Sequence, residues 1–538
     1  MNPVAKGMSE DWLSVWIGLL VFVLALGMSA GTDTLGWVVT TGVWTDVSKA
    51  LNPVSKAYSA LGGVGALIAT YLALLVAMTA GAAALKADLK RFALGFTAVF
   101  WISYLSWIAG SYANLAATTP ADMQRFGISW SLRLTNEGGF ILALIAGLIV
   151  GNFFPGFAAW MKEAVRPELY IKTAIVLLGG FLGIMAATQP VLAKSVLVRG
   201  LAAIIEAYLI YWAVVYFVAR KWFGFSREWA APLASGISIC GVSAAIATGG
   251  AIRARPIVPI MVASLVVIFA VVELLILPFA ANAFLAHEPM VAGAWMGLAV
   301  KTDGAAVASG AIAESLILAS AAAEGVNYAK GWILGTAATV KIFIDIFIGI
   351  WAFILAYIWT NHIEVRPAGD KAKIGEIWER FPKFIVGYVL TFLVVLLLAY
   401  GAAPQTSGKI RAAMGEANTF RVIFFIMTFF TIGVMSNFRK LWEEGIEARR
   451  GLRGLSLRLR HLGGSGDLLG VLRGGEATAR SQLKGRKIME QPKVGEEMRK
   501  MPVEPLLPVE KKLIGWSLGI GLVLLVILVF ATRGPVAG

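Results

Sequence analysis

Charged and hydroxyl side chains inside apolar stretches are the residues of this chain best suited to chemistry. The stretch MGLAVKTDGAAVASGAIAES places Lys301, Thr302 and Asp303 in a row, with Ser309 and Glu314 further along. A charge is costly inside a bilayer, so such residues usually face the interior of a helix bundle and mark a solute pathway. The alternative is an interhelical Lys–Asp pair that only stabilises packing.

A second stretch, SGISICGVSAAIATGG, combines small and polar residues. Its candidate binding residues are Ser235, Gly236, Ser238, Cys240, Gly241 and Ser243. Glycine weakens a helix interior, so this composition favours an interrupted helix whose free backbone N–H groups can bind an anion. A tightly packed face of small residues is the alternative interpretation.

Further charges lie in other apolar runs. Lys341 and Asp345 are four residues apart in TAATVKIFID, which places them on one helix face. They can neutralise each other, or Lys341 can attract an anion. Glu206 and Glu273 are isolated carboxylates that could carry a proton or hydrogen-bond to a neighbour. We take these two glutamates, with Asp303 and Asp345, as candidate coupling residues.

Other chemistries are disfavoured. The chain has no Walker A loop, GxSxG, HExxH or strand-linked GxGxxG motif. His287, His362 and His461 match no zinc spacing, and the single cysteine, Cys240, has small apolar neighbours. We therefore expect no enzymatic activity, no metal and no cofactor.

Hydropathy predicts the elements that position these residues. Of 538 residues, 58% are hydrophobic and 15% charged, whereas a soluble domain has about 25% charged residues. Runs long enough to span a bilayer, about 20 residues, lie near 12–30, 62–85, 92–113, 138–156, 169–188, 197–219, 230–250, 256–284, 291–320, 331–359, 382–403, 418–437 and 511–532. We expect an all-α polytopic transmembrane helix bundle of about thirteen helices, with Gly- and Ser-rich interrupted helices. Inverted repeats are a further arrangement consistent with such helices.

The runs divide the chain into four parts. Residues 1–135 form an N-terminal unit of about three transmembrane helices, 136–446 a transporter-like core bundle, 447–510 a basic polar segment, and 511–538 a C-terminal transmembrane helix. The first run could pass for a signal peptide, but acidic residues precede it, which favours an uncleaved helix.

The distribution of basic residues predicts orientation. Lys86–Arg91, Arg220–Arg227 and Arg366–Lys383 are basic loops that belong in the cytoplasm, together with the N-terminus. Arg253 and Arg255 then fall on the outer side. The formal net charge of +15 lies in such loops, so we expect the lipid bilayer of the cytoplasmic (inner) membrane as partner and no nucleic acid.

Residues 447–482 differ from the rest of the chain in composition. They are rich in Arg, Gly and Leu and contain no Phe, Ile, Trp, Tyr or Met. A flexible basic loop is one interpretation. Shifted codons from Arg449 to Gly475 can all encode apolar or small residues, a run long enough for one spanning helix. We hypothesise a local frameshift that removed a helix, although a restored helix would place the basic stretch Lys484–Lys512 outside.

Five stretches carry a resemblance to a known family. They are GLIVGNFFPG, IKTAIVLLGGFLG, SGISICGVSAAIATGG, the Lys341 helix and IGVMSNFRKLWEEG. Through them, the region from about Gly138 to Gly445 resembles the YeiH-like family of proposed sulfate exporters. The family continues after its NFRKL stretch into a further apolar helix, where this chain has its Arg-rich segment. The first three helices would be an N-terminal extension.

Two departures from the family bear on the substrate. The family has SIHE or SIHD where this chain has VKTD, so Asp303 matches the acidic residue and Thr302 replaces a histidine. The family tends to carry Arg three residues after the lysine matching Lys341, a position held here by Ile344. Loss of this cation weakens the inference of sulfate but not that of transport.

These observations favour a secondary transporter that exports a small anionic solute such as sulfate. A cation- or proton-coupled transporter of organic acids or sulfonates is the alternative, favoured by the acidic residues Asp303 and Asp345. A channel or a membrane-embedded enzyme is more remote. Saturable counterflow distinguishes a carrier from a channel.

Overall fold

The computed structural model describes residues 8–117, 120–132, 138–255, 257–363, 378, 381–436 and 504–532. The Arg-rich segment 447–482, on which the frameshift hypothesis rests, lies outside these residues.

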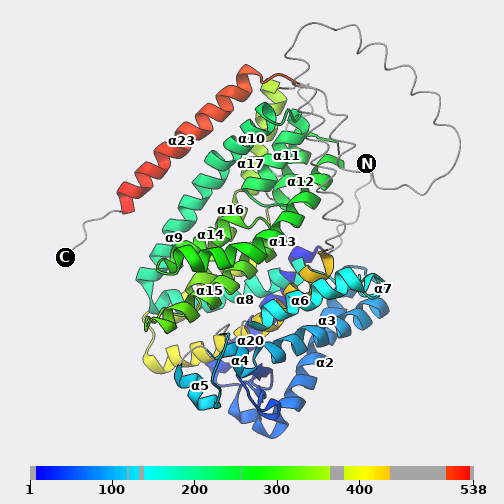
Figure 1. The fold of residues 1–538 in the computed structure, drawn as a ribbon, viewed down its shortest axis with the longest axis vertical. Helices are drawn as coiled ribbons and strands as arrows, with labels where there is room; N and C mark the ends of the chain where they lie inside the picture. The colour runs from blue at the N-terminus through cyan, green and yellow to red at the C-terminus, as the bar shows by residue number, and fades with distance from the viewer. Residues whose placement is uncertain are drawn as a thin grey trace, which may run out of the picture.

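The described chain is built almost wholly of helices (Figure 1). The first half contains α1 (Glu10–Leu26), α2 (Gly62–Ala84), α3 (Leu89–Gly110), α4 (Ala113–Ala116), α5 (Pro120–Phe126), α6 (Gly138–Phe153), α7 (Pro155–Trp160), α8 (Pro167–Thr188), α9 (Pro190–Ile205), the π-helical turn η4 (Glu206–Tyr211), α10 (Trp212–Lys221), α11 (Arg227–Ser238) and α12 (Ser243–Ile252). The second half contains α13 (Ile257–Leu285), α14 (Pro289–Ala299), α15 (Asp303–Ala323), α16 (Trp332–Ile346), α17 (Ile348–Ile358), the π-helical turn η5 (Trp359–Ile363), α19 (Phe384–Ala399), α20 (Pro404–Met435) and α23 (Pro508–Thr532). A short antiparallel pair, β1 (Val39–Thr41) and β2 (Leu51–Pro53), follows α1, together with the 3-10 turns η1 (Gly27–Ala30), η2 (Val47–Lys49) and η3 (Lys56–Leu61). The all-α expectation is confirmed.

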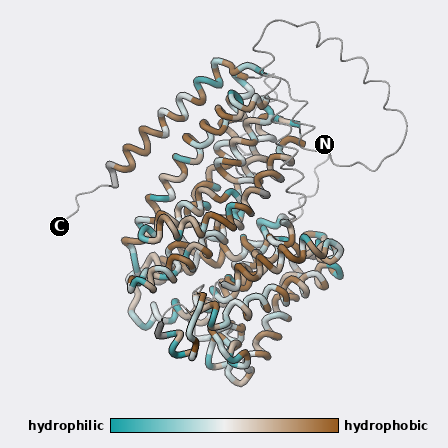
Figure 2. The backbone as a smooth tube through the Cα atoms, in the orientation of Figure 1, coloured by the Kyte–Doolittle hydropathy of each residue, from teal (hydrophilic) through white to brown (hydrophobic). Residues whose placement is uncertain are grey.

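The helices have the length and composition of membrane spans. Among the described residues, nine helical stretches are long and apolar enough to cross a bilayer, and five shorter helices are also apolar. Hydrophobic residues run along the helices, and hydrophilic ones gather near their ends (Figure 2). In lipid, a helix satisfies all its backbone hydrogen bonds internally, which explains why this apolar chain folds as a helical membrane protein with several spans.

Glycines bring pairs of helices into close contact. Gly293 and Gly297 of α14 face α16, and a Cβ on Gly297 would overlap the carbonyl oxygen of Ala337. Gly147 of α6 and Gly433 of α20 form a similar crossing, where either Cβ would meet the other helix's backbone. Small residues allow such approach where packing, and not the hydrophobic effect, drives helix association.

Two hydrophobic cores organise the bundle. The larger one joins side chains of α1, α3, α6, α8, α19 and α20 with the buried face of α15. The second joins α10, α11, α12 and α17 with the first half of α13. Helix α16 contributes Ala338 and Ile342 to the first core and Val340 and Ile344 to the second. It therefore lies between them.

Buried ion pairs connect distant parts of the sequence. Asp11 on α1 accepts a hydrogen bond from Lys172 of α8 at 2.9 Å, so the first helix packs against the bundle. At the start of α23, Glu510 pairs with Arg220 of α10 at 2.9 Å, with both side chains almost fully buried. The domain boundaries and the inverted repeat inferred from the sequence stay predictions.

Candidate functional site

Two of the expected membrane runs are each divided into two helices. In the run near 230–250, α11 ends at Ser238 and α12 begins at Ser243. In the run near 291–320, α14 ends at Ala299 and α15 begins at Asp303. Thr302 is extended, and its hydroxyl accepts from the N–H of Ala305, which caps α15. The interrupted helices predicted from glycine and hydroxyl content are confirmed at both places.

The two interruptions touch each other. The backbone N–H of Gly241 donates to the carbonyl oxygen of Lys301 at 2.6 Å. A Cβ at Gly241 would lie 2.7 Å from Cγ1 of Val266 and 3.2 Å from that same carbonyl oxygen. A larger residue at Gly241 would therefore collide with Val266 and press against the Lys301 carbonyl.

The ammonium group of Lys341 on α16 contacts both interruptions. Its Nζ lies 3.2 Å from Asp345 Oδ1 and 3.6 Å from Asp303 Oδ1, and it donates to the carbonyl oxygen of Ile239 at 2.9 Å. These three charged side chains are almost completely buried. Cys240 donates its S–H to Asp303 Oδ1 at 3.2 Å. One ammonium group is thus shared by two buried carboxylates.

Lys301 interacts with backbone carbonyls at the ends of the two half-helices. Its Nζ donates to the carbonyl oxygens of Leu298 and, at 3.4 Å, Ser238. These carbonyls belong to the last turns of α14 and α11, where helix ends leave acceptors unsatisfied and carry partial negative charge. Glu273 of α13 interacts with both the backbone and the ammonium of Lys301. Lys301 therefore compensates the two C-terminal half-helix ends.

The cluster has the composition of a cation-binding site. Cys240, Asp303 and Asp345 each offer a ligand atom, and these atoms lie within 4.8 Å of one another. Both Asp345 oxygens are buried without a hydrogen-bond partner among the described groups, so their interaction with Lys341 is electrostatic. Since Lys341 supplies a positive charge beside the same carboxylates, a metal is not required for their pairing.

Several predicted site residues make local contacts instead. Ser235 accepts from Trp212 Nε1 at 3.0 Å and from the Thr248 hydroxyl at 2.7 Å. Ser309 donates to a carbonyl of its own helix. A Cβ on Gly236 would lie 3.3 Å from the Gly241 carbonyl oxygen, so this glycine sits at the inside of the break. These residues support the interrupted helices.

The remaining predicted residues divide between the cluster and its surroundings. Ser238 contributes its carbonyl to the cluster and also donates its hydroxyl to Ala234. Ser243 is the first, half-buried residue of α12. Glu206 begins the π-helical turn η4 and has no part in the contacts that define the cluster within the described chain. Its coupling role stays a prediction.

Two buried charges outside the cluster, Arg421 and Glu314, were not among the predicted site residues. Arg421 is a buried charge on α20, in a run expected as a span, and so gave the same signal that selected Glu206. Glu314, noted as a charge, accepts from the N–H groups of Gly331, Ile333 and Leu334 at 2.8–3.0 Å. It caps the start of α16.

Together these features define a polytopic helical membrane protein whose interrupted helices meet at buried charges. The chain belongs to the family described as Conserved hypothetical protein 698, whose model matches residues 94–448. This confirms the resemblance to the YeiH-like family. The match begins within α3, earlier than the expected start at Gly138, and the N-terminal extension stays a prediction.

Relatives share this membrane character. A UPF0324 membrane protein of Nitrosomonas europaea is 40% identical over 444 residues, which cover 81% of this chain and 90% of the relative. A UPF0324 membrane protein of Rhodopirellula baltica is 30% identical over 75% of this chain, and the match spans 65% of that relative. No solved structure matches the chain.

Proposed function

We propose that the protein is an ion-coupled secondary transporter of a small anion, with its coupling site where the two interrupted helices meet. The supporting observation is the hydrogen bond between Gly241 and Lys301, which brings both breaks to one point beside Lys341. Discontinuous helices that meet near the bilayer midplane are typical of substrate and ion sites in secondary transporters. Irregular backbone is tolerated at that depth only within protein or beside a cavity.

The charges of the cluster support coupling to a proton or a monovalent cation. Asp303 and Asp345 share the ammonium of Lys341, so a proton or cation on one carboxylate would balance the excess negative charge. Binding of that proton or cation would weaken the attraction between Lys341 and the carboxylates. The positive potential of Lys341 would then be available to an anion. Binding of the two solutes would thus favour each other, which is what coupled transport requires.

The two cores supply parts that can move. Helix α16 carries Lys341 and Asp345 and has one side in each core. Rocking of one core against the other about this boundary would expose the cluster alternately to the two sides of the membrane. The same arrangement serves inorganic sulfate and the alternative substrates, sulfonates or organic acids.

The proposal is tested by counterflow into proteoliposomes. The full chain would be reconstituted with labelled sulfate, methanesulfonate or acetate outside and the unlabelled anion inside. We expect saturable counterflow of at least one anion and a loss of tenfold or more in Asp303→Asn. Glu324→Gln, which changes an exposed carboxylate just after α15, is the matched control and should keep the parent rate.

Other outcomes would contradict the proposal. Flux that rises without saturation would indicate a channel, and consumption of the solute would indicate an enzyme. Counterflow of none of the three anions by well-folded protein would remove the support for anion transport, and equal rates in Asp303→Asn and the parent would remove Asp303 from the mechanism.

A further inference from the structure

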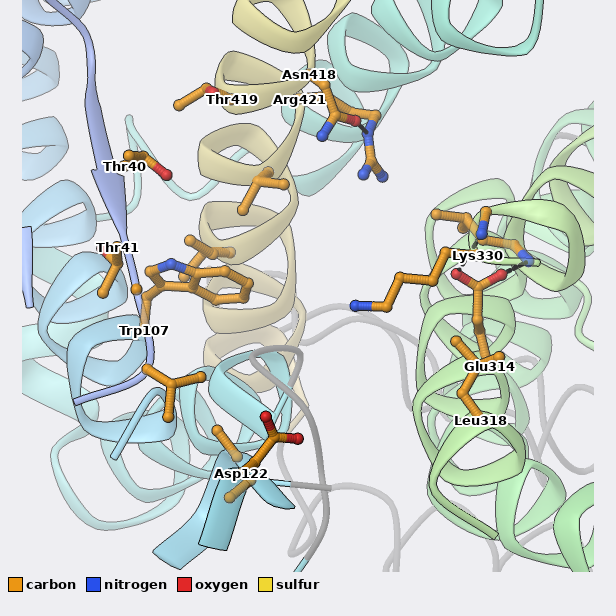
Figure 3. A pocket seen from close by; sticks show the side chains of 18 of the residues that line it. Thr40, Thr41, Trp107, Asp122, Glu314, Leu318, Lys330, Asn418, Thr419 and Arg421 are labelled. Carbon is orange, nitrogen blue, oxygen red and sulfur yellow. Dashed lines mark hydrogen bonds between the residues drawn. The ribbon is translucent and has the colours of Figure 1, made fainter. Parts of the chain in front are cut away.

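A second feature is a large cavity away from the charged cluster. It has a volume of about 820 Å³ and lies between the segments around β1, α5 and α20 on one side and α15 with the loop before α16 on the other (Figure 3). Thr41 and Trp107 form one wall, and Glu314 and Leu318 of α15 lie opposite. Neither the interrupted helices nor the family match accounts for this cavity.

Lys330 supplies a positive charge to the cavity. Lys330, in the loop before α16, extends its side chain into the open space (Figure 3), and no carboxylate of the described chain forms an ion pair with it. Arg421 lines the wall formed by α20; its Nε donates to Asn418 Oδ1 at 2.6 Å, and its guanidinium lies 4.8 Å from the Phe425 ring centroid. These contacts orient the guanidinium of Arg421 at the wall of the cavity.

The acidic groups in the cavity do not cancel this charge at Lys330. The oxygens of Glu314 accept three backbone N–H groups at the start of α16, where the helix dipole also opposes their charge. Asp122 lies on the α5 side, and Arg125 of the same helix also lines the cavity. The region around the ammonium of Lys330 is therefore suited to an anionic head group.

The lining also includes several large apolar side chains. Trp107, Phe181, Leu318, Val326 and Ile426 all line the cavity. Cavities of roughly 300–1,000 Å³ with mostly apolar walls and a few polar groups are typical of sites for organic ligands. An inorganic oxyanion would use the ammonium of Lys330 but leave these apolar side chains in contact with water.

We infer that this cavity binds an organic anion, with a sulfonate or carboxylate head at Lys330 and an apolar body against Trp107 and Leu318. This inference rests on the proposed transport function, because it makes the cavity a vestibule of the same pathway. Leu334 lines the cavity and lies seven residues before Lys341 on α16, a separation of roughly 10 Å along a helix. The cavity thus ends about two turns from the charged cluster.

The inference also assigns a role to the start of the chain. Val39–Val43, Trp107 and Arg125 line the cavity, and they all lie before the core of residues 136–446 inferred from the sequence. These segments complete a site whose remaining walls come from α15, α16 and α20.

The test measures binding to the detergent-purified full chain by titration calorimetry. The probes are sulfate, methanesulfonate, hexanesulfonate and hexanoate. We expect hexanesulfonate or hexanoate to bind at least tenfold more tightly than sulfate. Lys330→Gln should weaken their binding at least fivefold, and Leu318→Asn should weaken the six-carbon anions while leaving methanesulfonate unchanged. Size-exclusion profiles verify that each variant is folded.

Two controls separate this cavity from the coupling site and from surface charge. Lys49→Gln removes an exposed lysine near β2 that does not line the cavity and should leave binding unchanged. Asp303→Asn should abolish counterflow and leave binding of hexanesulfonate intact. Binding without counterflow in the parent would therefore contradict the proposed function while supporting the cavity as an anion site.

Three results would overturn the inference. They are absence of binding of every probe, equal affinity for sulfate and the six-carbon anions, and unchanged binding in folded Lys330→Gln. The first two would reject an organic anion as the occupant, and the third would reject this cavity as its location.

Discussion

At the scale of single residues, the central feature is one ammonium between two carboxylates. Lys341 lies within 3.6 Å of an oxygen of both Asp303 and Asp345 and also satisfies the carbonyl of Ile239. Taking charges out of water is costly, and a buried group that loses its partner is more costly still. The three side chains should therefore behave as a unit.

Replacement of Lys341 tests this interdependence. Lys341→Met leaves both carboxylates buried without their ammonium, so we expect a loss of about 3–5 kcal/mol in stability. The double variant Lys341→Met/Asp345→Asn has one fewer buried negative charge and should recover more than half of that loss. Thermal unfolding of the purified protein in detergent measures both changes.

An exposed lysine provides the comparison. Lys194→Met, on the outer surface of α9, should change stability by no more than about 0.5 kcal/mol. If Lys341→Met unfolds at the parent temperature, or if the second substitution brings no recovery, the cluster is not an interdependent unit.

At the scale of elements, close helix crossings hold the site in place. Gly293 and Gly297 let α14 approach α16, and α14 leads directly into the break at Lys301. The position of Lys301 relative to Lys341 therefore depends on this crossing as well as on the side chains themselves.

Two glycine substitutions with opposite expected effects test the crossing. Gly297→Ala places a methyl group against the Ala337 carbonyl oxygen and should destabilise the protein by about 1–3 kcal/mol. Gly408→Ala, at an exposed position of α20 where a Cβ meets nothing within 4 Å, should be neutral or stabilising by up to about 1 kcal/mol, because alanine favours a helix. Thermal unfolding measures both, and equal effects of the two changes would contradict a packing role for Gly297.

At the scale of the whole molecule, the basic loops and the succession of helices predict which segments share a side of the membrane. The loops at Lys86–Arg91 and Arg220–Arg227 are expected in the cytoplasm. Counting spans from there places η2 and the loop carrying Lys330 on the opposite side, so the cavity would open outward.

Cysteine labelling tests this topology without further changes, because Cys240 is the one cysteine of the chain and is buried. A membrane-impermeant maleimide should leave the parent unlabelled. It should label Ser48→Cys in intact cells and Lys90→Cys only after permeabilisation, since both positions are exposed on the protein. Labelling of both variants in intact cells would reject the assigned sides.

The frameshift hypothesis also belongs to this scale. The family match ends at residue 448, next to Arg449, where the shifted codons begin. Resequencing the DNA across codons 440–485 should show that the shifted reading encodes an apolar run from 449 to 475. An intact frame whose shifted reading contains no such run would end the hypothesis.

Local sequence was sufficient to predict the helices and their interruptions. Apolar runs indicate membrane-spanning helices, and Gly- and Ser-rich stretches indicate where a helix is interrupted. Both signals depend on only a few neighbouring residues. The breaks at Gly241 and Thr302 therefore appear where composition indicates them. The charges of Lys301, Asp303, Lys341 and Asp345 could also be recognised from their apolar surroundings.

The partners of those residues were decided by the tertiary structure. Ser235, Ser238 and Ser309 all lie in stretches of similar composition. Ser238 contributes its carbonyl to the cluster, whereas Ser235 and Ser309 form hydrogen bonds outside it. The difference arises because the side of a helix that faces the cluster depends on how the helices cross. The pairing of Gly241 with Lys301 joins residues sixty positions apart, and the cavity brings together segments as far apart in the sequence as Val39 and Ile426. Sequence alone determined a membrane helix bundle with charged, broken helices; which charges meet depended on close packing across the bundle, which no local preference encodes.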